Sequence, residues 1–379
     1  MKAINPFEVS GEISEDIYIK LVKDFGLKII DANLLNKIKQ HTKELHPLIE
    51  YGIFFAHRDL DLILSEYENG KPFYLYTGRG PSGEMHLGHL IPFYFTKWLQ
   101  EKFNVYLLIQ ITDDEKFLTK NLTEDQVSFY AKQNMLDILS LGFIKGKTFF
   151  ILDSRNAKIL YNLAIKFSKH VTFSQVRSTF GMNESDNIGK IFFPSIQAVP
   201  SFILSYLLNK PINCLIPYAI DQDDYFRLTR DVLPKLGYPK PASIVSKFLP
   251  SLIGEGKMSS SKKDTSIYLN DSEAEVRKKI FSAFSGGRDT KEEQIKYGAD
   301  LSKDVPFQIY RILEEDREKV EKVKEEYSSG KMLSGEMKEI TYRKVIQFLD
   351  ELKERREKIK DEIEEYMFDE EKIKKMLLI

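Results

Sequence analysis

The sequence is poor in cysteine, with Cys214 as the only one among 379 residues. A single thiol excludes a framework of intrachain disulfides and any zinc site built from several thiolates. Six histidines still permit a site of imidazole and carboxylate ligands, but we expect no structural metal. Such cysteine usage fits a reducing, cytoplasmic setting.

Long apolar runs are also missing, which excludes a membrane-spanning helix. The first residues, MKAINPFEVSGEISED, lack the basic and then apolar order of a secretory signal, so we expect no membrane partner. An excess of one charge is absent too, since 56 lysines and arginines face 57 acidic residues and the net charge is −1. Any contact with a polyanion must therefore depend on local basic patches.

The length of the chain and its patterns of apolar and charged residues indicate three regions. One hydrophobic core stops growing near roughly 250–300 residues, so a chain of 379 residues indicates more than one domain. Residues 1–70 show short helical patterns without a glycine-rich loop, and we expect an N-terminal helical extension that packs on the next domain. Residues 71–265 alternate apolar runs with helical stretches. Residues 266–379 form long charged helices with a clear internal turn at 328–335.

The middle region has the pattern of a parallel sheet. An apolar strand leads into a glycine-rich segment near residue 78, and continuous apolar runs follow at 105–111, 148–152 and 213–217. Runs of this kind suit strands that are covered on both faces. We therefore predict an α/β fold: a Rossmann-like, doubly wound parallel sheet, followed by an all-helical C-terminal domain.

The loop after the first strand of this sheet is suited to phosphate. Gly78, Gly80 and Gly83 permit close approach of the backbone, and His86 and His89 open the following helix. Free N–H groups at a helix N-terminus attract anions, and two imidazoles three residues apart share one face. The pattern predicts a triphosphate site.

Two other interpretations of this loop stay open. Gly78-x-Gly80-x-x-Gly83 literally matches the dinucleotide fingerprint, after a strand and before a helix, which alone would favour a dehydrogenase. The glycines could instead simply form a tight turn, with the histidines capping a helix.

A second candidate site is the run Lys-Met-Ser-Ser-Ser at 257–261, which follows Gly254 and Gly256. A mobile, basic loop rich in hydroxyls can close over a polyphosphate and stabilise the charge that develops on a leaving group. Taken alone, the run would equally suit a solvated linker or a phosphorylation site.

Together, the His-x-Gly-His element at 86–89 and the run at 257–261 resemble the two signatures of class I aminoacyl-tRNA synthetases, which usually read HIGH and KMSKS. Leu87 and Ser260 depart from these signatures but leave the histidines, the glycine and the first lysine intact. Longer strings, including YLYTGRGPS, IQITDDEKFL, FPSIQAVPSF and AIDQDDYFRLTRD, are similar to the tryptophanyl-tRNA synthetases of eukaryotes and archaea. The similarity runs from about residue 15 to the C-terminus.

This resemblance implies an enzyme that activates tryptophan with ATP, giving tryptophanyl-adenylate and pyrophosphate, and then transfers tryptophan to the 3′ end of its cognate tRNA. ATP acts as a substrate and carries Mg²⁺ with it, while the protein itself is expected to hold no metal. The implied partners are tryptophan, ATP, tRNA(Trp) and a second copy of the chain, in a homodimer joined through the catalytic domain at 71–265. The helical domain at 266–379 would read the anticodon.

The resemblance also assigns roles to residues of this chain. The implied ATP-binding residues are Gly78, Arg79, Gly80, His86, Gly88, His89, Lys257, Met258 and Ser259. The expected catalytic set is His86, His89, Lys257, Ser259 and Ser261. The implied tryptophan-binding residues are Tyr76, Gln110, Thr112, Glu115, Gln197 and Gln222.

The chemistry of tryptophan agrees with this pocket, because one indole N–H donor requires a buried acceptor between aromatic walls. Less specific interpretations remain for three of the residues. Gln110 could be an ordinary polar residue at a strand end, Glu115 could belong to a helix cap with the two preceding aspartates, and Gln197 could pack a loop.

Three rival functions remain. The sister family specific for tyrosine shares both signatures but lacks the GRGPS, TDDEK and AIDQD strings. A dehydrogenase leaves the run at 257–261 unexplained. A silent paralogue acting as an RNA-binding or scaffold module would not require an intact set of histidines, Lys257 and pocket polar groups. The basic residues of the last long helix could line a tRNA-binding face, or they could simply be the charged residues that any solvent-exposed helix carries. They are Arg343, Lys344, Lys353, Arg355 and Arg356.

Overall fold

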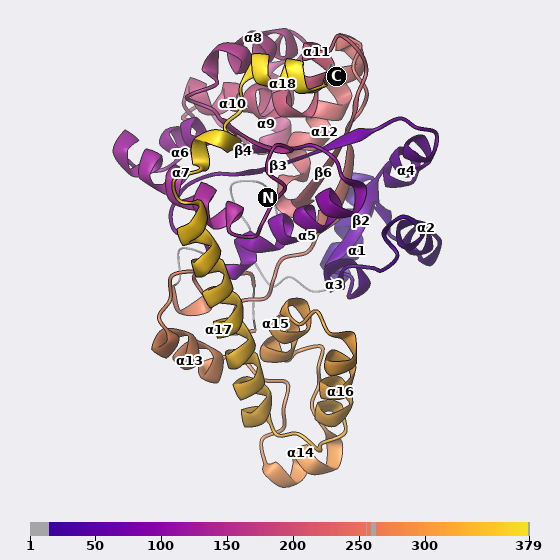
Figure 1. The fold of residues 1–379 in the computed structure, drawn as a ribbon, viewed down its shortest axis with the longest axis vertical. Helices are drawn as coiled ribbons and strands as arrows, with labels where there is room; N and C mark the ends of the chain where they lie inside the picture. The colour runs from indigo at the N-terminus through magenta and orange to yellow at the C-terminus, as the bar shows by residue number, and fades with distance from the viewer. Residues whose placement is uncertain (1–14, 255, 259–262, 378–379) are drawn as a thin grey trace.

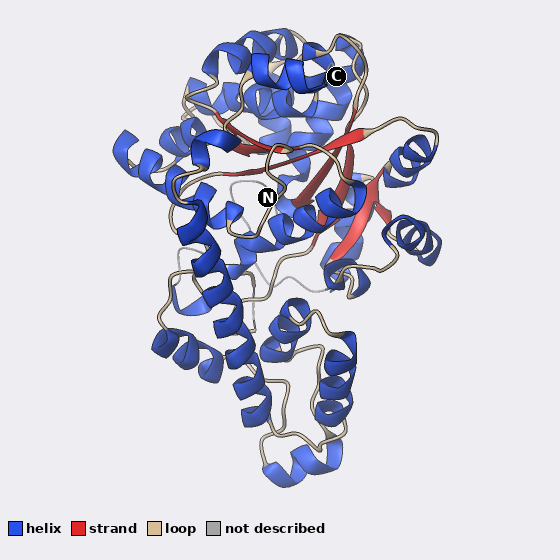
Figure 2. Cartoon of the chain, in the orientation of Figure 1, coloured by secondary structure: helices blue, strands red, loops and turns tan. Residues whose placement is uncertain are grey.

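The computed structural model describes residues 15–254, 256–258 and 263–377. A seven-stranded sheet lies within the upper body of the molecule, and a helical lobe extends below it (Figure 1, Figure 2). The strands are β1 (Lys28–Ile29), β2 (Phe54–Arg58), β3 (Phe73–Arg79), β4 (Leu107–Ile111), β5 (Thr148–Leu152), β6 (Asn213–Ala219) and β7 (Ala242–Ser246).

Five of these strands form the expected doubly wound sheet. They are parallel and lie in the order β5-β4-β3-β6-β7, so the chain leaves β3 towards β4 on one side and later returns to β6 on the other. The α/β prediction is confirmed. The runs predicted at 148–152 and 213–217 are β5 and the start of β6, whereas β7 was not predicted.

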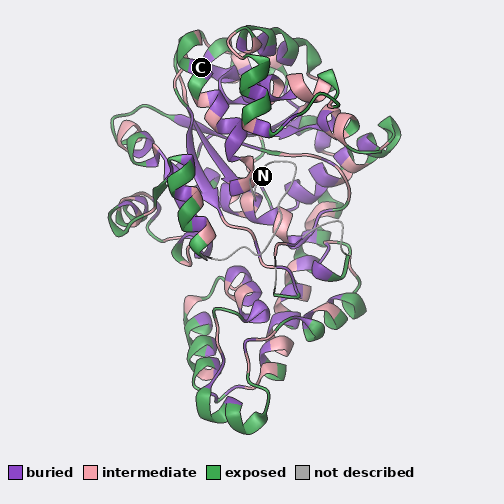
Figure 3. Ribbon diagram, turned by 180° about the vertical axis from the view of Figure 1, so that it is seen from behind, coloured by how far each residue is buried: buried purple, intermediate pink, exposed green. Residues whose placement is uncertain are grey.

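Helices cover both faces of the sheet. The helices before and within this part of the chain are α1 (Glu15–Phe25), α2 (Ala32–Thr42), α3 (Pro47–Glu50), α4 (Leu60–Glu68), α5 (Leu87–Phe103), α6 (Asp113–Thr119), α7 (Glu124–Leu139), α8 (Ala157–Ser168), α9 (Phe173–Phe180), α10 (Ile188–Ala198), α11 (Ile203–Leu207) and α12 (Asp223–Val232). Short 3₁₀ turns occur at Val199–Ser201, Ile220–Gln222, Leu233–Leu236 and Lys263–Thr265. Apart from β1, whose two residues are exposed, the strands are buried almost throughout their length (Figure 3).

The hydrophobic core consists of two layers, one on each face of the sheet, because successive side chains of a strand alternate between the faces. In β3, Phe73 and Leu75 belong to one buried cluster, while Tyr74 and Tyr76 belong to the other. Successive side chains of a strand point to opposite faces, so a continuous apolar run fills both layers. This pattern explains why parallel strands were recognisable in the sequence.

The N-terminal region differs from the expected helical extension. Besides α1 to α4, it contributes β1 and β2, and β2 pairs antiparallel with β7 at the edge of the sheet. All five residues of β2 are buried, because α3 packs beside it and Tyr18 of α1 contacts Phe55. A strand of five residues between helical segments is too short to show a clear period.

The C-terminal region is helical, as expected. It contains α13 (Glu273–Ser282), α14 (Lys291–Tyr297), α15 (Val305–Leu313), α16 (Arg317–Ser328), α17 (Ser334–Ile359), a 3₁₀ turn at Ile363–Tyr366 and α18 (Glu370–Leu377). The turn expected at 328–335 separates α16 from α17. The long helix α17 runs from the lobe to the body, and α18 lies near α8 and α11 (Figure 1).

The end of the chain therefore returns to the sheet. The backbone N–H of Phe368 donates to the carbonyl of Phe150 in β5 at 2.8 Å, and Phe368 joins the core layer that contains Tyr74. In the described part of the chain, no helix combines the length and apolar character needed to cross a bilayer.

His46 caps α3 from inside the core. Its Nδ1 accepts from the backbone N–H of Leu48 at 3.1 Å, and its ring contacts Tyr94, Phe95 and Trp98. Burial, reinforced by the nearby charge of Arg317, lowers the pKa of His46 to about 3. The ring is therefore neutral in the folded protein at pH 7.

We predict that replacing His46 by asparagine reduces the acid sensitivity of the fold. The unfolded chain binds a proton at His46 below about pH 6.5, whereas the folded chain does not until about pH 3, so stability falls as the pH decreases between these values. The asparagine side chain keeps a capping acceptor and cannot titrate. The slope of the unfolding free energy should decrease by up to about 1.4 kcal/mol per pH unit.

Urea unfolding between pH 4.5 and 7.5 measures this slope, with the fluorescence of Trp98, the only tryptophan of the chain, as the signal. His170→Asn, at a partly exposed histidine after α8, is the control and should leave the slope unchanged. Equal slopes for wild type and His46→Asn would show that the protons bind elsewhere.

Candidate functional site

A cavity of about 590 Å³ opens where the parallel strands β3, β4 and β6 end. Ligands of open α/β sheets bind at this point, where the chain turns to opposite sides of the sheet. Every predicted site residue within the described part of the chain lines this cavity. The two remaining predictions, Ser259 and Ser261, lie outside the described residues.

The two histidines form the floor of the cavity at the start of α5. His86 precedes the helix in an extended conformation, and its backbone N–H donates to Nδ1 of His89 at 3.3 Å. The two rings stack with their centroids 3.5 Å apart. Burial, with the nearby charge of Arg79, lowers the pKa of His86 to about 3 and holds the pKa of His89 well below its usual value. Both imidazoles are therefore neutral at pH 7.

Neutral rings at this position suit hydrogen bonding to a ligand. The two ring nitrogens of His86 are buried and have no hydrogen-bond partner among the described residues. A neutral imidazole carries one N–H donor, and a buried donor without a partner is costly. The floor of the cavity thus presents a donor for an incoming acceptor such as a phosphate oxygen.

Positive charge comes from two residues that are far apart in the sequence. Arg79, at the end of β3, donates from Nε to Oδ1 of Asn134 at 3.0 Å, and one of its terminal nitrogens has no partner among the described residues. Burial lowers the pKa of Arg79 to about 10, so the guanidinium remains charged at pH 7. Lys257 Nζ lies 3.3 Å from Oδ2 of Asp221 and 4.5 Å from the centre of the Phe248 ring.

Backbone hydrogen bonds join the first sequence signature to the segment that follows the second one. The N–H of Leu87 donates to the carbonyl of Ile267, and the N–H of Leu269 donates to the carbonyl of Met85. Gly88 is in close contact, because a Cβ placed there would lie 3.1 Å from the His86 ring and 3.2 Å from Cβ of Met258. The two signatures, which are far apart in the sequence, are therefore neighbours in the folded chain.

The inner end of the cavity holds a buried polar pair. Tyr76 and Gln110 are almost fully buried, and the Tyr76 hydroxyl donates to Oε1 of Gln110 at 2.6 Å. The same hydroxyl lies 2.9 Å from the carbonyl of Gln197. The Nε2 of Gln110 donates to both carboxyl oxygens of Asp153 at 2.9 Å. Gln110 is therefore part of a network and is more than a polar residue that ends a strand.

The acidic turn after β4 has two functions. Asp113 and Asp114 satisfy backbone donors, since Asp113 accepts from the N–H of Ser154 and Asp114 from that of Glu115. Glu115 instead lines the cavity, where its Oε2 lies 2.5 Å from Nζ of Lys116. The helix-cap interpretation does not describe this turn, because the cap position of α6 is Thr112, Asp113 accepts from the backbone after β5, and Glu115 lines the cavity.

The sequence did not single out several residues that line the cavity. Aromatic walls come from Phe193, Tyr225 and Phe226, and Asp221 is the partner of Lys257. Burial raises the pKa of Asp221, although Lys257 opposes this effect. The strings FPSIQAVPSF and AIDQDDYFRLTRD contain all four residues, but a string does not show which side chains face inward.

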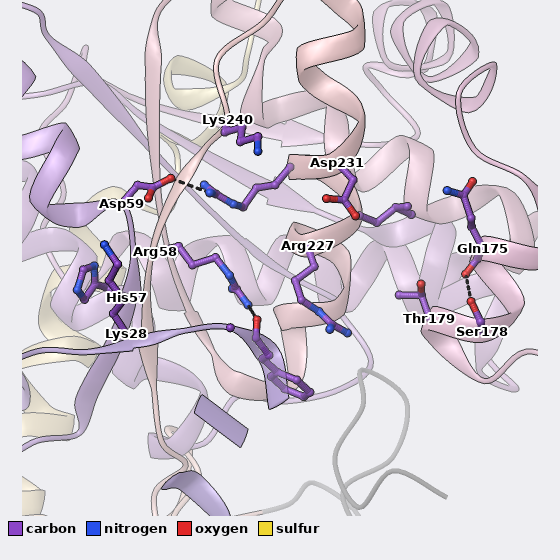
Figure 4. A pocket seen from close by; sticks show the side chains of 14 residues that line it. Lys28, His57, Arg58, Asp59, Gln175, Ser178, Thr179, Arg227, Asp231 and Lys240 are labelled. Carbon is purple, nitrogen blue, oxygen red and sulfur yellow. Dashed lines mark hydrogen bonds and ion pairs between the residues drawn. The ribbon is translucent and has the colours of Figure 1, made fainter. Parts of the chain in front are cut away.

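A second cavity, of about 460 Å³, lies between α1, β2 and α12 (Figure 4). Its lining is basic, yet its arginines already have partners: Arg230 pairs with Asp59 at 2.6 Å, and Arg58 and Arg227 both pair with Asp223. None of the predicted site residues lines it. The cavity at the strand ends is therefore the candidate site.

Comparison with known proteins identifies the family of the chain. Residues 68–350 match the family described as tRNA synthetases class I (W and Y). The chain is 47% identical to the tryptophan–tRNA ligase of Saccharolobus solfataricus, covering 98% of this chain and 97% of the relative. It is 48% identical to the cytoplasmic tryptophan–tRNA ligase of Homo sapiens, covering 95% of this chain and 79% of the relative.

Solved structures show the same fold. The tryptophanyl-tRNA synthetase from Encephalitozoon cuniculi bound to tryptophan superposes with a TM-score of 0.88 at 37% identity, covering 96% of this chain and all of the other. The chain therefore belongs to the class I tRNA synthetases for tryptophan and tyrosine and, within them, to the tryptophanyl-tRNA synthetases of archaea and eukaryotes.

Proposed function

We propose that the cavity at the strand ends activates tryptophan with ATP, forming tryptophanyl-adenylate and pyrophosphate, and that the chain then transfers tryptophan to the 3′ end of tRNA(Trp). One observation carries the proposal: a single cavity joins a cationic, donor-rich floor to a buried inner end with aromatic walls and the polar pair of Tyr76 and Gln110. The relatives named tryptophan–tRNA ligase support the same activity.

ATP occupies the outer part of the cavity in this proposal. The backbone at Gly78, Arg79 and Gly80 approaches the nucleotide, and His86 and His89 donate to its phosphates from the start of α5, with Gly88 between them. Lys257 and Met258 line the same cavity, and the proposal assigns Ser259 and Ser261 of the same run to the phosphates as well. Helix N-termini and unpaired N–H groups favour polyphosphate at such a position.

The first step needs no nucleophile from the protein. A carboxylate oxygen of tryptophan attacks the α-phosphorus, the bond to the bridging oxygen breaks, and pyrophosphate leaves with the electron pair. The protein contributes alignment and charge stabilisation. Lys257 is suited to stabilise the departing pyrophosphate because its ammonium group lines the cavity, where it contacts Asp221 and the Phe248 ring.

Magnesium fits this scheme as a companion of ATP. Mg²⁺ commonly binds through substrate phosphates and water. We therefore propose that phosphate oxygens hold the ion, which neutralises part of their charge.

Tryptophan occupies the inner end. Tyr76 and Gln110 receive the indole N–H, while Glu115, Gln197 and Gln222 surround the ammonium group, next to Thr112. The burial of Gln110 supports this assignment, since a buried acceptor selects strongly for a ligand that carries the matching donor.

Recognition of tRNA is assigned to the helical region 266–379, most of which forms the lobe below the body (Figure 1). At the far end of the lobe, α14 exposes Ile295 and Tyr297, and Lys296 lies over the Tyr297 ring. Exposed aromatic and basic side chains together can bind single-stranded bases. On α17, by contrast, Arg355 donates to the carbonyl of Ser140 and Arg356 contacts Gln133, so these two arginines join the lobe to the body.

We further propose a cytoplasmic homodimer joined through the catalytic domain, residues 71–265, with the N-terminal region 1–70 packed on it. Exposed apolar side chains on α8 to α11 support this arrangement, since a surface that pairs with another copy exposes such groups in the monomer. They are Tyr161, Ile165, Phe173, Ile188 and Tyr206.

The activity is tested by ATP–pyrophosphate exchange with purified protein and each of the twenty amino acids in turn, without tRNA. We expect exchange with tryptophan alone, because aromatic walls and a buried acceptor select for the indole. Exchange with tyrosine instead would preserve the chemistry and overturn the pocket assignment. Absence of exchange with every amino acid would favour a catalytically silent module.

Replacing Lys257 by alanine should lower the rate of adenylate formation by about 100-fold, with little change in the Kd of tryptophan, because the ammonium group acts on charge that develops in the transition state. Single-turnover formation of adenylate and equilibrium titration with tryptophan measure the two quantities. Lys263→Ala removes an exposed charge from the same segment outside the cavity and is the control. Equal losses of rate and tryptophan affinity would contradict a transition-state role.

Replacing Gly88 by alanine should raise the KM of ATP by about tenfold, because the new methyl group displaces the His86 ring or Met258 by a few tenths of an ångström. Gly83→Ala is the matched control in the same loop, since a Cβ there meets no atom within 4 Å. Steady-state exchange kinetics with varied ATP measure the effect. An unchanged KM in Gly88→Ala would show that this contact does not shape the ATP site.

A further inference from the structure

The side chain of Gln110 is fixed from both ends. Its oxygen faces the Tyr76 hydroxyl, and its amide nitrogen lies 2.9 Å from both carboxyl oxygens of Asp153. Gln110 is completely buried and Asp153 is 3% exposed, so water does not compete for these bonds. The parallel pairing of β4 with β5 sets the distance, because Ile111 pairs with Leu152, the residue before Asp153.

The orientation of this carboxamide decides what the cavity presents to a ligand. A carboxamide has a donor side and an acceptor side, and rotation by half a turn exchanges them. With the nitrogen towards Asp153, the oxygen faces the cavity and can accept a second hydrogen bond besides that of Tyr76. With the opposite orientation, an NH₂ group would face the indole N–H, and two donors would meet.

Asp114 makes the orientation firm. Asp114 and Asp153 are hydrogen-bonded to each other, and burial together with the charge of Asp114 raises the pKa of Asp153 well above its usual value. A proton between the two carboxyl groups is therefore engaged in their mutual hydrogen bond, whichever of the two carries it. Asp153 then has only acceptor capacity left for Gln110, and the Gln110 nitrogen must face it.

We propose that Asp153 is a positioning residue for tryptophan selection, which holds the Gln110 carboxamide with its oxygen towards the indole N–H. The inference rests on the proposed function, because it requires that tryptophan occupy the inner end of the cavity. Asp153 does not line the cavity itself, so it acts through Gln110 alone.

The test compares tryptophan with benzothienylalanine, in which sulfur replaces the indole N–H without changing the shape of the ring system. The ratio of kcat/KM for the two substrates in ATP–pyrophosphate exchange measures the contribution of the N–H bond. In Asp153→Leu this ratio should fall at least about tenfold, through a higher KM for tryptophan, because Gln110 is no longer oriented. The KM of ATP and the kcat/KM of benzothienylalanine should stay near the wild-type values.

Asp153→Asn should restore the ratio. Its amide nitrogen can donate to Asp114 as the shared proton does, which leaves its oxygen to accept from Gln110. Asp113→Asn is the matched control, since Asp113 is also buried and acidic but accepts from the backbone of Ser154. If Asp153→Leu does not fold, Asp153→Ser, whose side chain is too short to bridge to Gln110, is expected to show the same loss.

A double-mutant cycle completes the test. In a Gln110→Ala background, Asp153→Leu should cause no further loss in the ratio, because there is no carboxamide left to orient. A loss of the same size for both substrates, or an additive loss in that background, would overturn the proposal and leave Asp153 a structural role. Failure of wild-type protein to exchange with tryptophan would instead contradict the proposed function.

Discussion

The pairing of β3 with β4 on one side and with β6 on the other is the constraint on which the site depends. Leu75 pairs with both Leu107 and Leu215, so three strand ends reach the same edge of the sheet. Gly78 lies opposite Gln110, and a Cβ there would come within 3.1 Å of the Gln110 carbonyl. A larger residue would separate the two strands at the point where the cavity opens.

The sequence predicted those parts of this arrangement that depend on residue patterns within a single strand, loop or helix. Continuous apolar runs identified the parallel strands, and the spacing of Gly78, His86 and His89 identified the loop and helix start that line the cavity. The strands β1 and β2 were not predicted because each is short. Asp153 was not predicted because its partner Gln110 is 43 residues away. Arg355 and Arg356 were expected either to line a tRNA or to be solvated charges of the helix, since their contacts lie in α7 and the loop after it, more than 200 residues earlier. Hydrophobic periods describe single elements, whereas these contacts arise only after the elements pack.

Within the cavity, the neutral histidines are suited to hydrogen bonding, whereas the charged side chains of Arg79 and Lys257 are suited to stabilising negative charge. Two imidazolium rings could not stack at 3.5 Å in a buried position without strong repulsion. The lowered pKa values of His86 and His89 remove that conflict, and the rings act through hydrogen bonds. Charge stabilisation is left to Arg79 and Lys257, whose cations enter from different parts of the chain. Such a division allows a polyphosphate to be bound without four adjacent cations that would destabilise the folded protein in its absence.

Selection among aromatic ligands requires the polar network more than the aromatic walls. Phe193, Tyr225 and Phe226 favour any flat apolar ring, and contacts of this kind distinguish ligands by only about 10- to 200-fold for each methylene group. A buried acceptor is more discriminating, because a ligand without a donor at that depth leaves the acceptor unpaired in a medium of low polarity. The discrimination exists only if the acceptor cannot rotate away to find another partner. Fixing Gln110 between Tyr76 and Asp153 meets that condition, so the specificity of the cavity extends one layer beyond the residues that line it.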